Sequence, residues 1–98
     1  MNIDAIINTA IILSQKGRLM EAIQYMTDLL KYQPFNVKVL LNFNTLLMQE
    51  KELRHEMIKQ NFDKIFQVEK DNEKAMFNNA IYLSKQVQDS GGLSLISS

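Results

Sequence analysis

The sequence predicts an all-α chain of about five helices, and three observations lead to that prediction. Apolar residues recur at intervals of three and four along most of the chain, which is the pattern of helices with one buried face. Signals that are typical of β-strands are absent. Glycine and proline are rare, three and one residues among 98, and Gly17 and Pro34 stand where one helix has to end and another begin. The predicted architecture is a series of helical hairpins.

The expected helices follow one another with short turns between them. Gly17 ends the first, and Pro34-Phe35-Asn36 separates the second from the third. The five expected ranges are 3–15, 19–32, 37–49, 53–68 and 73–88. Buried faces are expected on the second helix at Leu19, Ala22, Ile23, Met26, Leu29 and Leu30, and on the fourth at Met57, Ile58, Phe62, Ile65 and Phe66.

Asparagine and aspartate precede two of these helices. Asn36, and either Asp71 or Asn72, are expected to be N-caps because their side chains can accept hydrogen bonds from the free amide groups of a first helical turn. Residues 89–98 are rich in glycine and serine and are expected to form a flexible tail. The domain organisation expected is one helical domain, residues 1–88, followed by that tail.

The composition is that of a globular domain without a strong electrostatic field. Apolar residues make up 46% and charged residues 22%, and eleven basic side chains balance eleven acidic ones. Neither nucleic acid nor a membrane is therefore expected as the main partner. Cysteine is absent, and no apolar run has the roughly 20 residues that a membrane span needs. We expect a cytoplasmic protein.

A short motif recurs along the chain. Two apolar residues followed by asparagine occur as Ile6-Ile7-Asn8, Leu40-Leu41-Asn42 and Met76-Phe77-Asn78, at spacings of 34 and 36 residues. A fixed period of this length is the sequence signature of stacked helical hairpins.

This repeat resembles the tetratricopeptide repeat (TPR), a 34-residue pair of helices with the pattern W-x2-L-G-x2-Y, A-x3-F and P. The first copy reads Ile6-x2-Thr9-Ala10-x2-Leu13, Ala22-x3-Met26 and Pro34. The second reads Leu40-x2-Phe43-Asn44-x2-Leu47, Ile58-x3-Phe62 and Lys70, with two extra residues between its helices, and the third stops after Met76-x2-Asn79-Ala80-x2-Leu83. The resemblance covers residues 3–88 and implies a TPR-like α-solenoid of two and a half repeats. The alternative is an irregular bundle of five helices.

Residue patterns for catalysis or metal binding are not found. His55 is the only histidine, lies between Arg54 and Glu56, and is expected to be a solvated residue of a charged helix start. With no cysteine and no pair of histidines at ligand spacing, zinc has no ligand set, and none of the three glycines lies in a phosphate-binding loop. We therefore expect no enzymatic activity, no catalytic residue, no metal and no cofactor.

The resemblance implies a concave groove lined by the first helix of each repeat, which in TPR proteins binds an extended peptide or a helix. Lysine and asparagine clamp a carboxylate C-terminus in some TPR proteins, but only Asn42 and Lys74 match that pattern, so an amphipathic helix is the expected ligand. Carried over position by position, the expected partner-binding residues are Ile7, Ile11, Leu41, Thr45, Met48, Phe77 and Ile81.

The expected function is that of a protein-binding chaperone or adaptor. The array is incomplete at two and a half repeats, so we expect a partner to complete it, as a hetero-oligomer with an amphipathic helix or a small helical protein. In size, repeat number and charge the chain is similar to the small bacterial chaperones that hold type III secretion needle subunits. The alternative is a homo-oligomeric or regulatory scaffold that uses the groove, or the exposed last helix, for assembly.

Overall fold

The computed structural model, which describes residues 2–89, has five helices and confirms the all-α prediction. They are α1 (Ile3–Gln15), α2 (Leu19–Tyr32), α3 (Val37–Leu47), α4 (His55–Val68) and α5 (Glu73–Asp89). The expected flexible tail, apart from Asp89, falls outside the described residues. None of the helices within residues 2–89 combines the length and the hydropathy needed to cross a bilayer.

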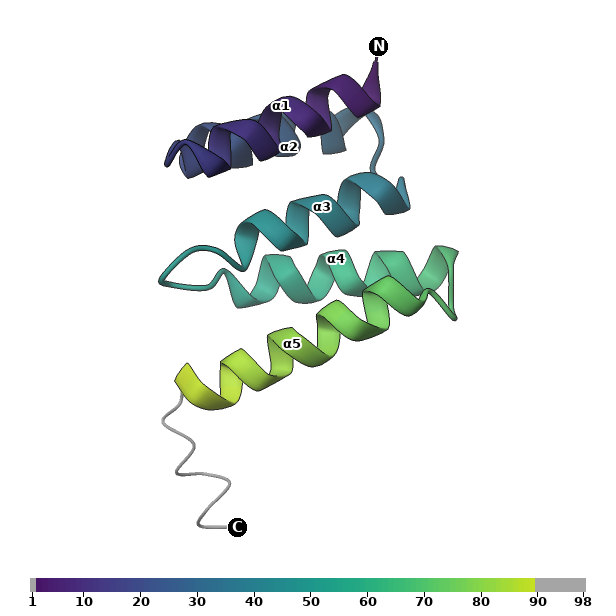
Figure 1. Ribbon diagram of the computed structural model, residues 1–98. Helices are drawn as coiled ribbons and strands as arrows, with labels where there is room; N and C mark the ends of the chain where they lie inside the picture. The colour runs from purple at the N-terminus through teal and green to yellow at the C-terminus, as the bar shows by residue number, and fades with distance from the viewer. Residues whose placement is uncertain (1, 90–98) are drawn as a thin grey trace, which may run out of the picture.

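The helices pack in chain order and form a row (Figure 1). α1 pairs with α2, α3 pairs with α4, and the two hairpins meet through α2 and α3. α5 is the last helix of the row and contacts α4 and α3. Sequential packing of this kind follows from the short turns, because helices joined by two to eight residues become antiparallel neighbours.

Gly17 ends the first helix through its backbone conformation. Its φ angle is 81°, a left-handed conformation that side chains with a Cβ rarely adopt. Arg18 N–H donates to the carbonyl of Leu13 at 2.9 Å, and Gly17 N–H donates to that of Ser14 at 3.1 Å. This pair of hydrogen bonds is a Schellman motif, which satisfies two carbonyl groups at the end of α1 and turns the chain toward α2.

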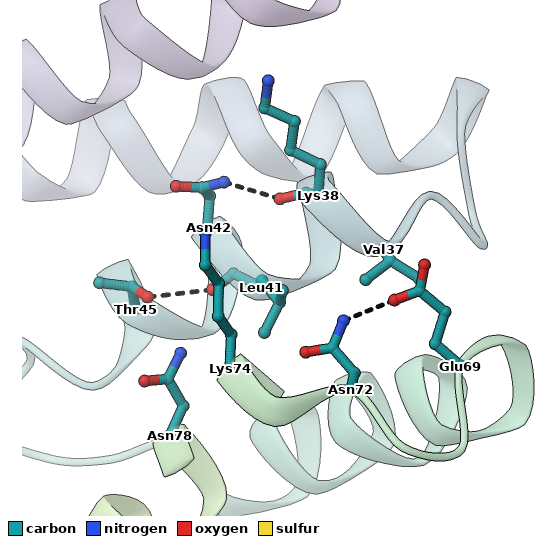
Figure 2. Close-up of a pocket in the computed structure, with 9 residues that line it drawn as sticks. All are labelled: Val37, Lys38, Leu41, Asn42, Thr45, Glu69, Asn72, Lys74 and Asn78. Carbon is teal, nitrogen blue, oxygen red and sulfur yellow. Dashed lines mark hydrogen bonds between the residues drawn. The ribbon is translucent and has the colours of Figure 1, made fainter. Parts of the chain in front are cut away.

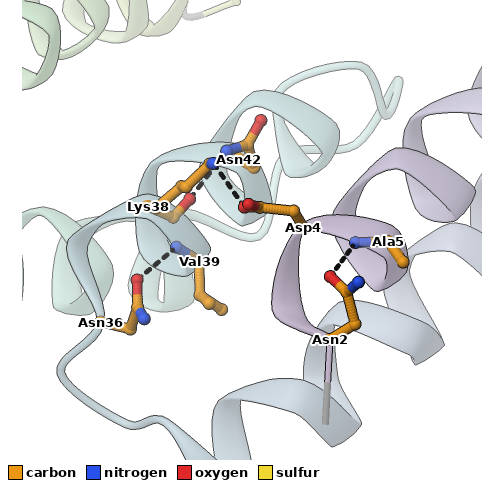
Figure 3. A network of polar contacts seen from close by, with 7 residues as sticks. All are labelled: Asn2, Asp4, Ala5, Asn36, Lys38, Val39 and Asn42. Atoms are coloured by element: carbon orange, nitrogen blue, oxygen red, sulfur yellow. Dashed lines mark hydrogen bonds and ion pairs between the residues drawn. The ribbon is translucent and has the colours of Figure 1, made fainter.

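Asparagine side chains cap three of the helices. The Oδ1 atom of Asn2 accepts from Ala5 N at 3.0 Å, and that of Asn36 accepts from Val39 N at 3.2 Å (Figure 3). Of the two residues considered at the start of α5, Asn72 is the cap, since its Oδ1 accepts from Ala75 N at 2.8 Å. Each cap satisfies one of the amide groups that a first turn leaves without a partner.

The turn between α3 and α4 is longer than the sequence indicated. α3 ends at Leu47 and not at residue 49, and α4 begins at His55 and not at residue 53. Residues 48–54 contain methionine, glutamine, glutamate, lysine, leucine and arginine, all good helix formers, so local propensity gives no sign of the turn. Shorter-range hydrogen bonds from Gln49 N to Leu46 O and from Glu50 N to Leu47 O tighten the chain there.

One core extends through the two hairpins and reaches α5. Most residues of the faces expected to be buried on α2 and α4 are in it: Ala22, Ile23, Met26 and Leu29 from α2, and Ile58, Phe62 and Ile65 from α4. The others expected there, Leu19, Leu30, Met57 and Phe66, are partly buried against it. α5 contributes Ala75 and Tyr82, whose ring packs against those of His55 and Phe62. The core therefore fixes α5 against α4, which also determines how α5 lies relative to α3.

Candidate protein-binding groove

Two adjoining hollows between α3 and α5 form a groove on the surface. Their volumes are about 430 and 290 Å³, and they share Thr45 and Asn78, so they are parts of one depression. We call it the α3–α5 groove. The larger hollow, shown in Figure 2, is lined by Val37, Lys38, Leu41, Asn42, Thr45, Glu69, Asn72, Lys74 and Asn78, and the smaller by Thr45, Met48, Gln49, Asn78, Ile81 and Lys85.

Helical spacing explains why these residues share one side. On α5 the lining residues Lys74, Asn78, Ile81 and Lys85 are separated by four, three and four positions, which places them in one stripe. Leu41 and Thr45 form the matching stripe on α3. The fully buried residues of both helices lie on other faces, and Leu41 is half-buried against the core, so the core holds the two stripes in place.

Several polar groups of the groove are already hydrogen-bonded within the chain (Figure 2). The Asn42 amide donates to the carbonyl of Lys38 at 2.8 Å, and the Thr45 hydroxyl donates to that of Leu41 at 3.0 Å. The Asn72 amide donates to the Glu69 carboxylate at 2.5 Å. These side chains fold back on their own helix or turn, so the floor of the groove is less polar than its composition suggests.

Lysine residues dominate the charge around the groove. Lys38 forms an ion pair with Asp4 of α1 (Figure 3), and Lys85 Nζ donates to the carbonyl of Met48 at 3.1 Å. Lys74, which is exposed, has no ion pair or hydrogen bond to any side chain or carbonyl of the described residues. Among the described residues, Glu69 is the one carboxylate that lines the larger hollow. The Lys74 end of the groove therefore has a positive charge that no carboxylate of the described residues neutralises.

The predicted partner-binding residues divide into three groups. Leu41, Thr45, Met48 and Ile81 line the α3–α5 groove, although Met48 is itself buried. Phe77 lines neither hollow and is 67% exposed on α5. Ile7 and Ile11 lie away from the groove.

The placement of α1 differs from the expected concave row. Ile7 is 2% exposed and belongs to the core, and Ile11 is half-buried against it. The physical reason is that α1 contacts α3 as well as α2, so this side of α1 is covered by the chain itself. In the folded monomer the groove is consequently built by α3 and α5, with no open surface at Ile7.

Sequence reasoning missed the polar part of the groove, chiefly Lys38, Glu69, Asn72, Asn78 and Lys85. The sequence did contain a signal for two polar residues of the groove. The asparagine that ends each copy of the repeated motif supplies Asn42 and Asn78, one from each wall. Glu69 and Asn72 come from the turn before α5, whose path depends on packing and not on local pattern.

His55 is not the solvated residue that its charged neighbours suggested. Its ring is half-buried, and Nδ1 lies 2.6 Å from the hydroxyl oxygen of Tyr82, a hydrogen bond between the start of α4 and the middle of α5. Burial raises the pKa of the Tyr82 hydroxyl above its ordinary value. The pair fastens α5 to α4, and this contact gives the histidine a structural role.

Comparisons with models of known protein families and with curated proteins find no match for this chain.

Proposed function

We propose that this chain is a TPR-like chaperone or adaptor that holds an amphipathic helix of a protein partner in the α3–α5 groove. The hydrophobic face of that helix would rest on Leu41 and Ile81 and extend over Phe77. Helix-in-groove recognition of this kind depends on anchors spaced by three, four and seven residues, which match a groove bounded by two helices.

The repeat interpretation is supported by a contact between two residues one period apart. The Lys38–Asp4 ion pair joins the first turns of α3 and α1, and its two residues are 34 positions apart and equivalent in the repeat. Equivalent positions of neighbouring hairpins are adjacent in stacked repeats, so this contact favours a TPR-like array over an irregular bundle.

The observation that carries the function is the exposure of large apolar side chains beside the groove. Phe77 is 67% exposed and Ile81 is 38% exposed, next to half-buried Leu41. Apolar side chains gathered around a depression are typical of protein interaction sites, whereas single exposed ones are ordinary. The free cation of Lys74 at one end adds a preference for a helix with an acidic residue there.

Within this class, the resemblance favours a chaperone that shields a secreted helical subunit, such as a type III secretion needle subunit, before its assembly. A groove that covers the apolar face of such a client would oppose its self-association. The second candidate is a homo-oligomeric or regulatory scaffold, which is favoured by a separate apolar surface on α5 described below.

The test is selection of helical peptides from a displayed library with the whole protein as bait. We expect enrichment of peptides with apolar residues at i, i+3 or i+4 and i+7 and with an acidic residue at one end. The selected peptides should lose at least about tenfold in affinity on Ile81→Asp, because the new carboxylate must be desolvated without a partner.

Ile12→Asp is the matched control, since Ile12 is 50% exposed on α1 and lines neither hollow of the groove. Its peptide affinities should equal those of the unchanged protein. Equal affinities for Ile81→Asp as well, or a failure to enrich amphipathic helices at all, would contradict the proposed groove.

A further inference from the structure

The repeat allows the three odd-numbered helices, α1, α3 and α5, to be compared position by position. Ala10 of α1, Asn44 of α3 and Ala80 of α5 are equivalent, as are Leu13, Leu47 and Leu83. In the first two hairpins this face is covered by the following helix: Ala10 and Leu47 are 0% exposed, and Asn44 is hydrogen-bonded to α4. On α5 the same face has no following helix within the described residues.

The uncovered face is an apolar stripe. Met76, Ala80 and Leu83 are spaced by four and three residues, so they stand in line on one side of α5. Met76 is 54% and Leu83 49% exposed, whereas their equivalents in α3, Leu40 and Leu47, are completely buried. We call these three residues the α5 stripe. It faces away from α4, which packs on Ala75 and Tyr82, and it is distinct from the stripe that lines the groove.

We propose that the α5 stripe is a homodimer interface, in which α5 packs antiparallel against α5 of a second copy of this chain. The order of the side chains is large, small, large, and its midpoint lies beside Ala80. A two-fold axis at that point sets Met76 against Leu83 of the second copy and Ala80 against Ala80, so the stripe is complementary to itself. A small residue at the crossing lets two helices approach closely.

The distribution of charge on α5 favours a second copy of this chain over other occupants of the α5 stripe. Near a two-fold axis every charged residue approaches the same charge in the second copy, which opposes dimer formation. α5 carries no charged residue from Ala75 to Ser84, and this uncharged segment has the same midpoint as the stripe. The flanking residues Lys74 and Lys85 belong to the groove side of the helix. The dimer thus leaves both α3–α5 grooves open.

The oligomeric state and its dependence on the stripe provide the first test. Sedimentation equilibrium of the full chain should show a reversible monomer–dimer equilibrium. Leu83→Asp should raise the dimer dissociation constant by roughly 100-fold or more, because an isologous interface contains the change twice and buries both carboxylates. Ile12→Asp, at an equally exposed position at the other end of the row, should leave the equilibrium unchanged.

Cross-linking provides a second test that needs no disruption of the interface. The chain has no cysteine, so a single Ala80→Cys variant contains one thiol per molecule. At the two-fold axis the two Cα atoms would lie within disulfide range, and a mild thiol oxidant such as diamide should convert the variant to a covalent dimer. Thr9→Cys, exposed on α1, should remain largely monomeric under the same conditions.

Three results would overturn the proposal. The first is a protein that stays monomeric up to millimolar concentration. The second is a dimer that neither responds to Leu83→Asp nor cross-links through Ala80→Cys, which would place its interface elsewhere. The third is that the full chain stays monomeric whereas a chain ending at Gln88 dimerises. That result would mean that residues 89–98 cover the stripe.

Discussion

Asn61 of α4 donates a hydrogen bond from Nδ2 to Oδ1 of Asn44 of α3, at 2.9 Å and in the interior of the protein. The Nδ2 atom of Asn44 in turn donates to the carbonyl of Ile58 at 3.1 Å. In the TPR pattern that the sequence resembles, the position of Asn44 normally holds a small residue, which lets the two helices approach. Here a buried amide pair occupies that position and fixes the register of α3 and α4 by directional bonds.

Asn44→Ala should therefore lower the free energy of unfolding by about 1 to 3 kcal/mol, because it leaves the buried Asn61 amide without its acceptor. Urea denaturation followed by circular dichroism measures this loss. Asn42→Ala on the same helix removes only a bond to the carbonyl of Lys38 at the surface, and it should cost less than about 0.5 kcal/mol. Equal losses for the two variants would show that the amide pair contributes nothing specific.

Much of the fold could be predicted because its boundaries depend on local chemistry. Gly17, Asn36 and Asn72 act on residues within five positions of themselves, and the expected bounds of the first two helices agree with the structure. The turn after Leu47 could not be predicted, because the residues there favour helix and only packing interrupts it. Local pattern thus predicted helices and caps, and tertiary packing decided the longest turn.

Replacing Gly17 should test the Schellman motif directly. A Cβ atom added at Gly17 meets nothing within 4 Å, so the cost of Gly17→Ala is the left-handed backbone alone, about 1 to 2 kcal/mol. Gly17→Asn should cost less, since asparagine tolerates this conformation better than alanine. Thermal melts of the two variants compare these costs, and a larger loss for asparagine than for alanine would contradict the backbone explanation.

The site was less predictable than the fold. The repeat register predicts Leu41, Thr45 and Ile81 on one surface, and these residues line one groove. It also placed Ile7 on that surface, although contact of α1 with α3 buries it. Register defines the direction of a side chain relative to its own helix, whereas exposure depends on how neighbouring hairpins close on each other, which differs between the first and the last.

Two phenylalanines should distinguish core from surface. Phe62 is 3% exposed and packs near Phe66 and Tyr82, so Phe62→Ala should lower the free energy of unfolding by about 3 to 5 kcal/mol. Phe77 is 67% exposed, and Phe77→Ala should change the free energy of unfolding by no more than about 0.5 kcal/mol. Chemical denaturation of both variants measures the two changes in the free energy of unfolding. A large loss for Phe77→Ala would mean that this side chain is structural and not available to a partner.

Tyr82 should make the stability of the protein fall at alkaline pH. Its hydroxyl is buried, and desolvation raises its pKa in the folded state above the ordinary value of about 10 that applies to the unfolded chain. Below that pH both states hold the proton, and the contribution of the buried tyrosine is fully present. As the pH rises above about 10 the unfolded state releases the proton first, so unfolding becomes more favourable until the folded-state pKa is passed.

To isolate the contribution of the Tyr82 hydroxyl, the unfolding free energies of the unchanged protein and of Tyr82→Phe are measured across the alkaline range and compared. The two proteins share every other ionisable side chain, so the contributions of those side chains cancel in the difference. Tyr82→Phe also loses the hydrogen bond to His55, which should lower its stability at neutral pH by about 1 kcal/mol. The stability advantage of tyrosine over phenylalanine should therefore shrink as the pH rises through and beyond 10. A difference that stays constant over this range would show that the Tyr82 hydroxyl ionises equally well in both states, and that α5 is not closed over it in solution.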